Sequence, residues 1–251
     1  MKHIVSIILL LVFTSPAVAT ATPPQAYNLY IPFSTHTHNI AKGLAMADPH
    51  HPEDRAALNI SWWYGWYWDT APGFVPMVRE MQMPPTCEPY ILVGNEPDSI
   101  EPYGHPVTPQ DAAEIVEEIE NVCPGSRLVV GNVTQDGEAW LTSFLQEYKT
   151  ATGHVYANGL GVHCYQWSAG MCVEKLSRLR ALYNGEMWVT EFNDFSGDVA
   201  EFNRLLDYIA ATFTRYAVFT NRQLSGPGFL HGPIVNDDGT LTPRGLVYSE
   251  R

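Results

Sequence analysis

The sequence has 251 residues and a formal net charge of −13, with 16% of its residues charged and 12% aromatic. A charge of this sign argues against nucleic acid or an anionic membrane surface as a partner. The composition fits an uncharged ligand better, because neutral sugars stack on aromatic rings, although aromatic side chains also fill protein cores.

Residues 1–21 are typical of a secretion signal. Lys2 and His3 give it a polar start, Ile4 to Phe13 form an apolar stretch, and Ala17-Val18-Ala19 supplies small residues for cleavage. The apolar stretch is too short to span a bilayer. Residues 22–251 are long enough for one large domain. We therefore expect a secreted protein, extracellular or periplasmic, that acts as a monomer and needs no cofactor or metal.

From residue 42 onward, short apolar runs alternate with helical patterns. The clearest helix opens at Thr108, which suits an N-cap and is followed by proline at the first helical position. No convincing helix follows the second or third strand, so those units should be abbreviated. Strands are expected at 42–47, 59–64, 74–77, 90–94, 127–131, 160–163, 187–190 and 216–220, and further helices at 52–58, 140–148, 173–183 and 198–214. Eight strands alternating with helices predict an α/β fold, a compact TIM (β/α)8 barrel in a single domain.

Two glutamates follow predicted strands. Glu96 lies in Gly94-Asn95-Glu96-Pro97-Asp98, and Glu191 follows the run Met187-Trp188-Val189-Thr190. Pro97 favours extended geometry for Glu96 and removes an amide donor, so the strand should stop there. The carboxyl ends of barrel strands carry the active site. Two carboxyl groups at that rim suit glycosidic bond cleavage, in which one protonates the leaving oxygen and the other attacks or activates water.

Four cysteines in an exported chain suggest two disulfides, with three possible pairings. In the barrel interpretation, Cys87 precedes a strand and Cys123 ends the following helix, so both lie at the amino-terminal floor. Cys164 and Cys172 flank a loop at the opposite rim. The predicted bridges are therefore Cys87–Cys123 and Cys164–Cys172.

Six segments carry a resemblance to a known family, in the expected order: 61–66, 74–77, 94–98, 188–192, 215–219 and 238–248. On these motifs the chain resembles glycoside hydrolase family 128, small retaining barrels that cleave β-1,3-glucans. The resemblance implies that Glu96 is the acid/base and Glu191 the nucleophile. The family commonly has tryptophan where this chain has Val218, and that tryptophan is expected to stack on the sugar, so the departure bears on glucan preference.

Further residues are candidates for substrate binding, each with a plainer alternative. Asn95 would hydrogen-bond the sugar 2-hydroxyl, or else be a turn asparagine. His163 and Tyr165 could hold Glu191 ionised, or form a buried pair satisfied by backbone. Trp66 and Trp68 are favoured as sugar platforms, with Trp167 and Phe219 as weaker candidates.

Two further patterns bear on metal binding and glycosylation. His36 and His38 alternate as two metal ligands could, but no third ligand suggests itself and a polar loop is favoured. Sequons begin at Asn59 and Asn132 and overlap predicted strand ends.

The resulting hypothesis is a secreted endo-β-1,3-glucanase that works by double displacement. Glu96 must start protonated, so its pKa is expected to be raised by apolar surroundings and by the charge of Glu191. The alternatives are another β-glycan (xylan, mannan or an exopolysaccharide) and a barrel that binds polysaccharide without cleaving it.

Overall fold

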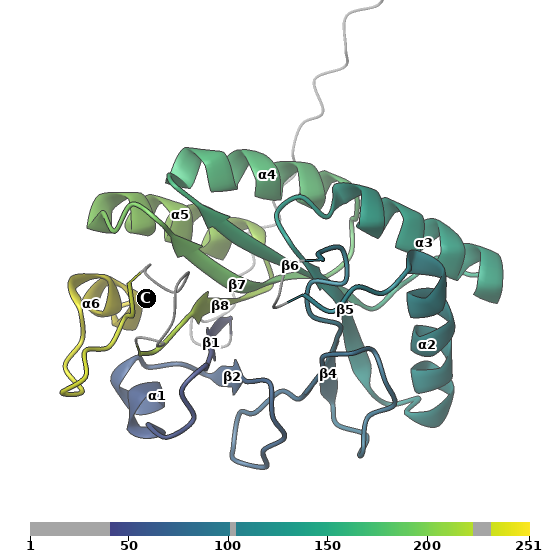
Figure 1. The fold of residues 1–251 in the computed structure, drawn as a ribbon, viewed down its shortest axis with the longest axis horizontal. Coiled ribbons are helices and arrows are strands. Elements are labelled where there is room, and N and C mark those ends of the chain that lie inside the picture. Colours follow the sequence, from purple (N-terminus) through teal and green to yellow (C-terminus); the bar gives the residue numbers. More distant parts are fainter. Residues whose placement is uncertain (1–40, 101–103, 223–231) are drawn as a thin grey trace, which may run out of the picture. The chain divides into compact units, whose positions relative to one another are not determined.

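The computed structural model describes residues 41–100, 104–222 and 232–251. The predicted secretion signal and the His36/His38 pair lie outside these residues. Eight parallel strands form one sheet in the order β2-β1-β8-β7-β6-β5-β4-β3 (Figure 1). They are β1 (Lys42–Ala45), β2 (Trp62–Tyr64), β3 (Met77–Val78), β4 (Tyr90–Val93), β5 (Arg127–Val133), β6 (Gly159–Gln166), β7 (Met187–Asp194) and β8 (Arg215–Phe219).

The sheet curves into a nearly closed barrel. Between β2 and β3 the closure uses backbone just ahead of β3: the Trp63 amide donates to Gly73 O at 3.0 Å, and the Val75 amide donates to Trp63 O at 2.9 Å. The predicted TIM-like (β/α)8 fold is therefore confirmed.

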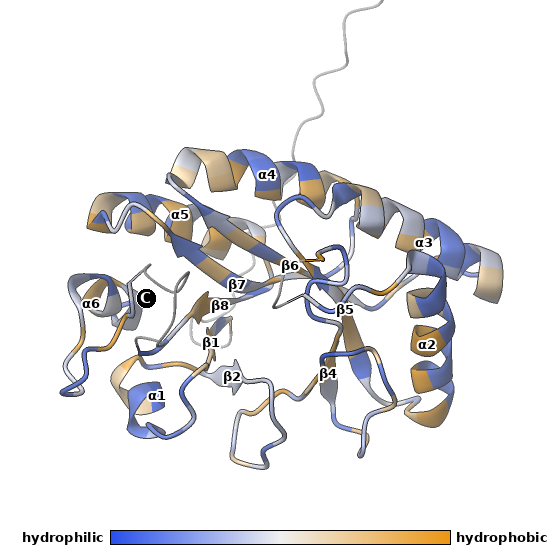
Figure 2. Ribbon diagram, in the orientation of Figure 1, coloured by the Kyte–Doolittle hydropathy of each residue, from blue (hydrophilic) through white to orange (hydrophobic). Residues whose placement is uncertain are grey.

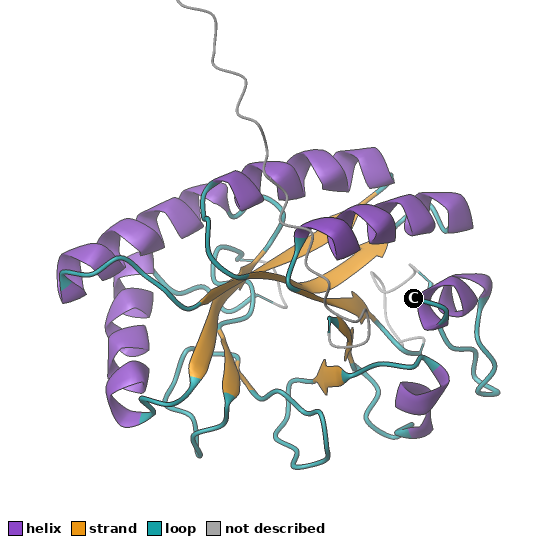
Figure 3. Cartoon of the chain, turned by 180° about the vertical axis from the view of Figure 1, so that it is seen from behind, coloured by secondary structure: helices purple, strands orange, loops and turns teal. Residues whose placement is uncertain are grey.

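Helices follow six of the strands and cover the outside of the sheet (Figure 1). They are α1 (Glu53–Ala57), α2 (Pro109–Val122), α3 (Glu138–Thr152), α4 (Ala169–Ala181), α5 (Val199–Thr212) and α6 (Pro243–Ser249). As predicted, Thr108 caps α2, with its side chain accepting a hydrogen bond from the Asp111 amide. Loops alone follow β2 and β3 (Figure 3), so the abbreviated units are also confirmed.

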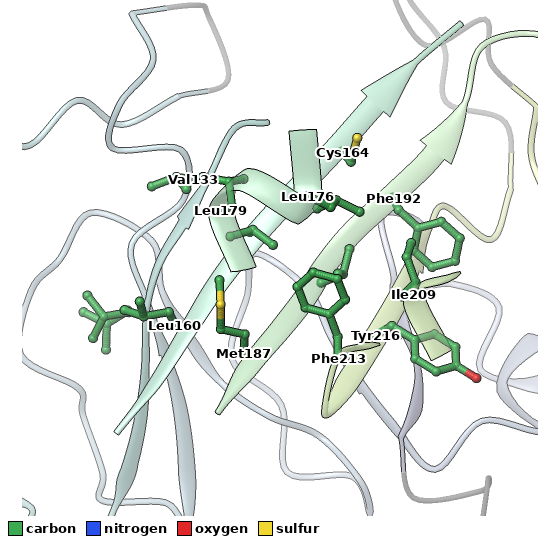
Figure 4. Close-up of a cluster of buried hydrophobic side chains, with 14 of the residues drawn as sticks. Val133, Leu160, Cys164, Leu176, Leu179, Met187, Phe192, Ile209, Phe213 and Tyr216 are labelled. Atoms are coloured by element: carbon green, nitrogen blue, oxygen red, sulfur yellow. The ribbon is translucent and has the colours of Figure 1, made fainter. Parts of the chain in front are cut away.

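Side chains alternate between the two faces of the barrel wall and produce two packed layers. The outward-facing layer packs against helices, whose hydrophobic residues interrupt their hydrophilic surfaces (Figure 2). Figure 4 shows part of this layer, where Leu160, Met187, Phe192 and Tyr216 from the strands meet Leu176, Leu179 and Ile209 from α4 and α5.

The inner layer closes the amino-terminal end of the barrel with aromatic rings. The ring centres of Trp62 and Trp188 are 5.0 Å apart, and those of Tyr90 and Trp188 are 5.4 Å apart. The Arg215 guanidinium stacks 4.4 Å from Tyr90 and 4.6 Å from Trp188. Gly43 is required beside this floor, because a Cβ there would lie 2.3 Å from the Trp62 ring.

Both predicted disulfides are present. Cys87–Cys123 joins Cα atoms 5.3 Å apart, and Cys164–Cys172 joins Cα atoms 5.9 Å apart. The second bridge spans the turn from β6 into α4 and fixes the loop at the carboxyl-terminal rim.

β5, β6 and β7 are longer and less regular than the sequence pattern predicted, whereas β1, β2 and β3 are shorter. The register shifts between Gly131 and Val133, between Val162 and His163, and between Val189 and Phe192. Such bulges let a strand continue pairing while they re-aim its side chains. Glu191 therefore lies within β7 rather than after its end, and His163 lies within β6. This corrects the strand ends expected at residues 163 and 190.

Candidate active site

Two carboxyl groups, from the end of β4 and from β7, meet at one histidine. Nδ1 of His163 lies 3.0 Å from Oε1 of Glu96, and Nε2 lies 3.4 Å from Oε1 of Glu191. The histidine side chain is fully buried, while 17% of the Glu96 side chain and 7% of the Glu191 side chain are exposed. One imidazole thus connects the two glutamates at the same rim of the barrel.

Glu96 takes up an unusual backbone conformation. Its φ is 49°, in the left-handed region, instead of the extended geometry expected from Pro97. The Glu96 amide donates to Asn132 O at 3.0 Å, and the Asn132 side-chain amide donates to Gly94 O at 3.0 Å. These bonds hold the turn in a conformation that costs a non-glycine residue free energy and that is found preferentially at functional sites.

Glu191 accepts hydrogen bonds from two tyrosines. The Tyr64 hydroxyl lies 2.9 Å from Oε1, and the Tyr165 hydroxyl donates to Oε2. Both carboxylate oxygens are therefore engaged, which fixes the side-chain rotamer and favours the ionised form.

The three titratable groups shift one another's pKa values. Burial alone would lower the pKa of His163, but the negative charge of Glu191 and the hydrogen bond to Glu96 outweigh it and raise that pKa. Burial would raise the pKa of Glu96, but the hydrogen bond and positive charge of His163 lower it. Burial, reinforced by the charge of Glu96, raises the pKa of Glu191 against the opposing effects of His163 and the two tyrosines.

The sequence-based expectation of a raised pKa for Glu96 is therefore wrong. It considered apolar surroundings and the charge of Glu191. It left out a buried imidazole that donates directly to Glu96 and stabilises the carboxylate.

Asn95 and Trp66 lie next to this pair. Asn95 is 4% exposed, and its Oδ1 accepts a hydrogen bond from the indole Nε1 of Trp66 at 3.0 Å. Because Oδ1 faces Trp66, the orientation of the Asn95 amide is fixed. The indole ring of Trp66 is half-buried, with its centre 5.7 Å from the Tyr64 ring.

Phe219, at the end of β8, joins the aromatic side chains of the rim. Its ring meets Trp66 edge-on at 5.8 Å and Tyr165 at 5.9 Å. The preceding residue, Val218, is fully buried in the helix-side layer. Val218 therefore packs in the core, and Phe219 is the residue of this segment whose ring lies among the aromatic side chains of the rim.

The remaining predicted platforms lie apart from this group. Trp68 packs against the helix-side core cluster. Trp167 is 64% exposed on the loop after β6, and its ring contacts Phe195. The structure therefore brings Glu96, Glu191, Asn95, Trp66, His163, Tyr165 and Phe219 together and leaves Trp68 and Trp167 outside this group.

Sequence reasoning missed two residues that position the site, Tyr64 and Asn132. Tyr64 alternates with the inward-facing Trp62, so the period of a strand could have placed it inside the barrel. Asn132 carries no comparable signal: it is the extra residue of a bulge, fully buried, with φ of 49°. Its side chain donates to Val93 O, Gly94 O and Val129 O, and it accepts from Thr190 Oγ1 at 2.9 Å. Asn132 therefore ties the turn that carries Glu96 to the residue that precedes Glu191.

Replacing Asn132 with aspartate should destabilise the fold. A carboxylate would face three carbonyl oxygens that now receive a donor, so we expect the free energy of unfolding to fall by about 3 kcal/mol or more. Urea denaturation measures this loss. Asn59→Asp is a matched control, because Asn59 also has positive φ (51°) and begins a sequon but is exposed. The control should change stability by less than about 0.5 kcal/mol. Equal effects at both positions would contradict the role given to Asn132.

Among the described residues, no group of three His, Cys, Asp or Glu side chains lies close enough together to hold a metal ion. In the same part of the chain, every helix is too short or too polar to cross a membrane.

Comparison with known proteins is consistent with this geometry. Residues 43–248 match the model of the family described as "Glycosyl hydrolase catalytic core". No curated protein matches the chain in a sequence search.

Solved structures from glycoside hydrolase family 128 share the fold. An endo-β-1,3-glucanase from Lentinula edodes is 18% identical with a TM-score of 0.71, over 84% of this chain and 99% of that one. A curdlan-specific exo-β-1,3-glucanase from Blastomyces gilchristii, solved with glucose, is 22% identical with a TM-score of 0.62, over 84% and 98%. An oligosaccharide-binding protein from Trichoderma gamsii is 19% identical with a TM-score of 0.59, over 87% and 96%. These structures confirm the resemblance to family 128 at the level of the fold.

Proposed function

The chain belongs to the glycosyl hydrolase catalytic core family, and we propose that it is a secreted, retaining endo-glycosidase that acts on β-1,3-glucan. The observation that carries this proposal is the pair Glu96 and Glu191, joined at one rim by His163. The likeness to family 128 glucanases supports the choice of glucan. The two disulfides fit an oxidising compartment, and we infer that the protein acts there as a monomer.

In the first step, Glu191 attacks the anomeric carbon and the glycosidic bond breaks, leaving a glycosyl ester on Glu191. The hydrogen bonds from Tyr64 and Tyr165 aim the carboxylate and oppose the burial that raises its pKa. Asn95, whose carbonyl oxygen accepts from Trp66, lies next to Glu96 and hydrogen-bonds the sugar 2-hydroxyl.

The departing oxygen receives its proton from Glu96. The raised pKa of His163 and the lowered pKa of Glu96 support a resting state in which the imidazole carries that proton. When sugar covers the site and excludes water, two neutral partners are favoured over a desolvated ion pair. The proton then passes from Nδ1 of His163 to Oε1 of Glu96, and from there to the leaving oxygen.

In the second step, Glu96 is a carboxylate and removes a proton from the water that hydrolyses the ester. Esterification has by then removed the negative charge of Glu191, which helps to raise the pKa of His163. The imidazole is therefore less basic in the glycosyl-enzyme and competes less with Glu96 for the proton.

Replacing His163 with glutamine should move the acid limb of the kcat/KM profile to higher pH. The charge of His163 opposes the raised pKa of Glu191, so its loss raises that pKa further, and the nucleophile stays protonated up to a higher pH. We expect the acid limb to shift by about one pH unit or more. The profile is measured with an aryl β-glycoside of a short β-1,3-glucan oligosaccharide.

The matched control for this change is His154→Gln, because His154 is exposed on the loop before β6. The control should keep the profile of the unmodified protein. An unmoved acid limb in the His163 variant would contradict the electrostatic role of the imidazole.

The substrate is tested by product analysis on a panel of curdlan, laminarin, mixed-linkage β-glucan, xylan and mannan. We expect a ladder of oligosaccharides from the β-1,3-glucans. Glucose as the main early product would indicate exo action. Binding without any hydrolysis would favour a non-catalytic barrel; the Trichoderma gamsii neighbour is described as an oligosaccharide-binding protein.

A further inference from the structure

Trp167 presents its indole ring to solvent at the rim of the barrel that carries Glu191. It is 64% exposed and lies on the loop between β6 and α4. Single exposed hydrophobic residues are common on protein surfaces. Exposure alone therefore does not assign a role to Trp167, but the residues that surround its ring do.

A row of aromatic rings leads from Trp167 to the nucleophile. Trp167 meets Phe195 edge-on, with ring centres 5.5 Å apart, and Phe195 stacks on Tyr165 at 6.0 Å with an interplanar angle of 12°. The Tyr165 hydroxyl donates a hydrogen bond to Glu191. The exposed ring is thus two aromatic contacts away from a residue that touches the reacting carboxylate.

The loop that carries Trp167 is held in place on both sides. The Cys164–Cys172 disulfide closes it. The Phe195 amide donates to Gln166 O at 2.8 Å, and the Ala169 amide donates to a carboxylate oxygen of Glu201 at 2.8 Å. A ring on such a loop is already ordered before a ligand arrives, so stacking on it costs little conformational entropy.

We propose that Trp167 and Phe195 form an outer sugar subsite, on which a glucosyl unit of the leaving part of the glucan chain stacks. The proposal rests on the proposed function and extends it to chain length. In the order of the sheet, β6 lies between the strand of Glu191 and the strand of Glu96, which protonates the leaving group. Trp66 follows β2 and Phe219 ends β8, and both strands lie on the other side of β7 in the sheet order. The subsite therefore selects long chains and suits internal cleavage.

The test compares a long and a short substrate in a Trp167→Ala variant. For a β-1,3-glucan hexasaccharide, KM should rise about tenfold, as expected for the loss of one aromatic contact. An aryl glycoside of a β-1,3-linked disaccharide has no sugar on the leaving side, so its KM and kcat should be unchanged. Trp167→Phe should recover most of the lost affinity because it keeps a ring.

Two controls separate this inference from the proposed function. Val155→Ala removes an exposed hydrophobic side chain from the loop before β6, at the other end of the barrel, and should alter neither substrate. The second control uses a Glu191→Gln background, in which the hexasaccharide is not hydrolysed. There, calorimetry should show that Trp167→Ala weakens hexasaccharide binding by the same factor of about ten. Unchanged binding of the hexasaccharide, or an equal loss on both substrates, would overturn the subsite. Absence of hydrolysis by the unmodified protein would instead overturn the proposed function.

Discussion

Replacing Glu191 with glutamine is expected to reduce kcat on β-1,3-glucan by at least about 10⁴-fold. The amide cannot attack the anomeric carbon, and the proposed mechanism offers no other route to the glycosyl ester. The fold should persist, because the amide occupies the same volume and its oxygen can still accept from Tyr64 or Tyr165. Reducing-sugar release measures the loss, and thermal unfolding checks the fold.

The control for Glu191→Gln is the same change at Glu174, on the outer face of α4. Its side chain is 71% exposed and pairs with Arg178. Glu174→Gln should keep full activity. Residual hydrolysis by the Glu191 variant within tenfold of the unmodified protein would mean that another group is the nucleophile.

Replacing Glu96 with alanine should slow hydrolysis of glucan by about 10²- to 10⁴-fold, the usual contribution of a general acid. The first step should suffer much less with a dinitrophenyl glycoside, whose leaving group needs no proton. The glycosyl ester on Glu191 should then accumulate, because no base activates water. Added azide should accelerate its breakdown and give a β-glycosyl azide, since an anionic nucleophile needs no base.

The contrast between the two glutamates makes this prediction specific. Azide should not give a β-glycosyl azide with the Glu191 variant, because that variant forms no ester to displace. If the Glu96 variant loses activity equally on glucan and on the dinitrophenyl glycoside, and azide has no effect, then Glu96 is not the acid/base.

The order of the strands and of helices α1 to α5, the abbreviated units and the disulfide pairing could be predicted because they depend on local patterns, whereas α6 was not expected. The helix that opens at Thr108 carries its own cap, and alternation of apolar runs with helices leaves few other topologies. Cys87 and Cys123 could be paired because each lies at a predictable end of the barrel.

The details of the site depend on departures from regular pattern. An apolar run does not reveal that Asn132 is a bulge residue with positive φ, or that β7 continues past a register shift to Asp194. The position of His163 between two carboxyl groups arises from three strands that meet only in the folded barrel. Because that contact reverses the pKa shift expected for Glu96, the proton distribution of the site could not be predicted from the sequence.

The most direct test of the account is the anomeric configuration of the first product. Double displacement needs the two carboxyl groups about 5–5.5 Å apart, whereas single displacement needs roughly 6.5–9.5 Å to admit a water molecule. Proton NMR, recorded within the first minutes of hydrolysis of a β-1,3-glucan oligosaccharide, separates the two. Double displacement predicts that the β-anomer appears first and that the α-anomer forms later by mutarotation. Initial appearance of the α-anomer would contradict it, and would make Glu191 a general base instead of a nucleophile.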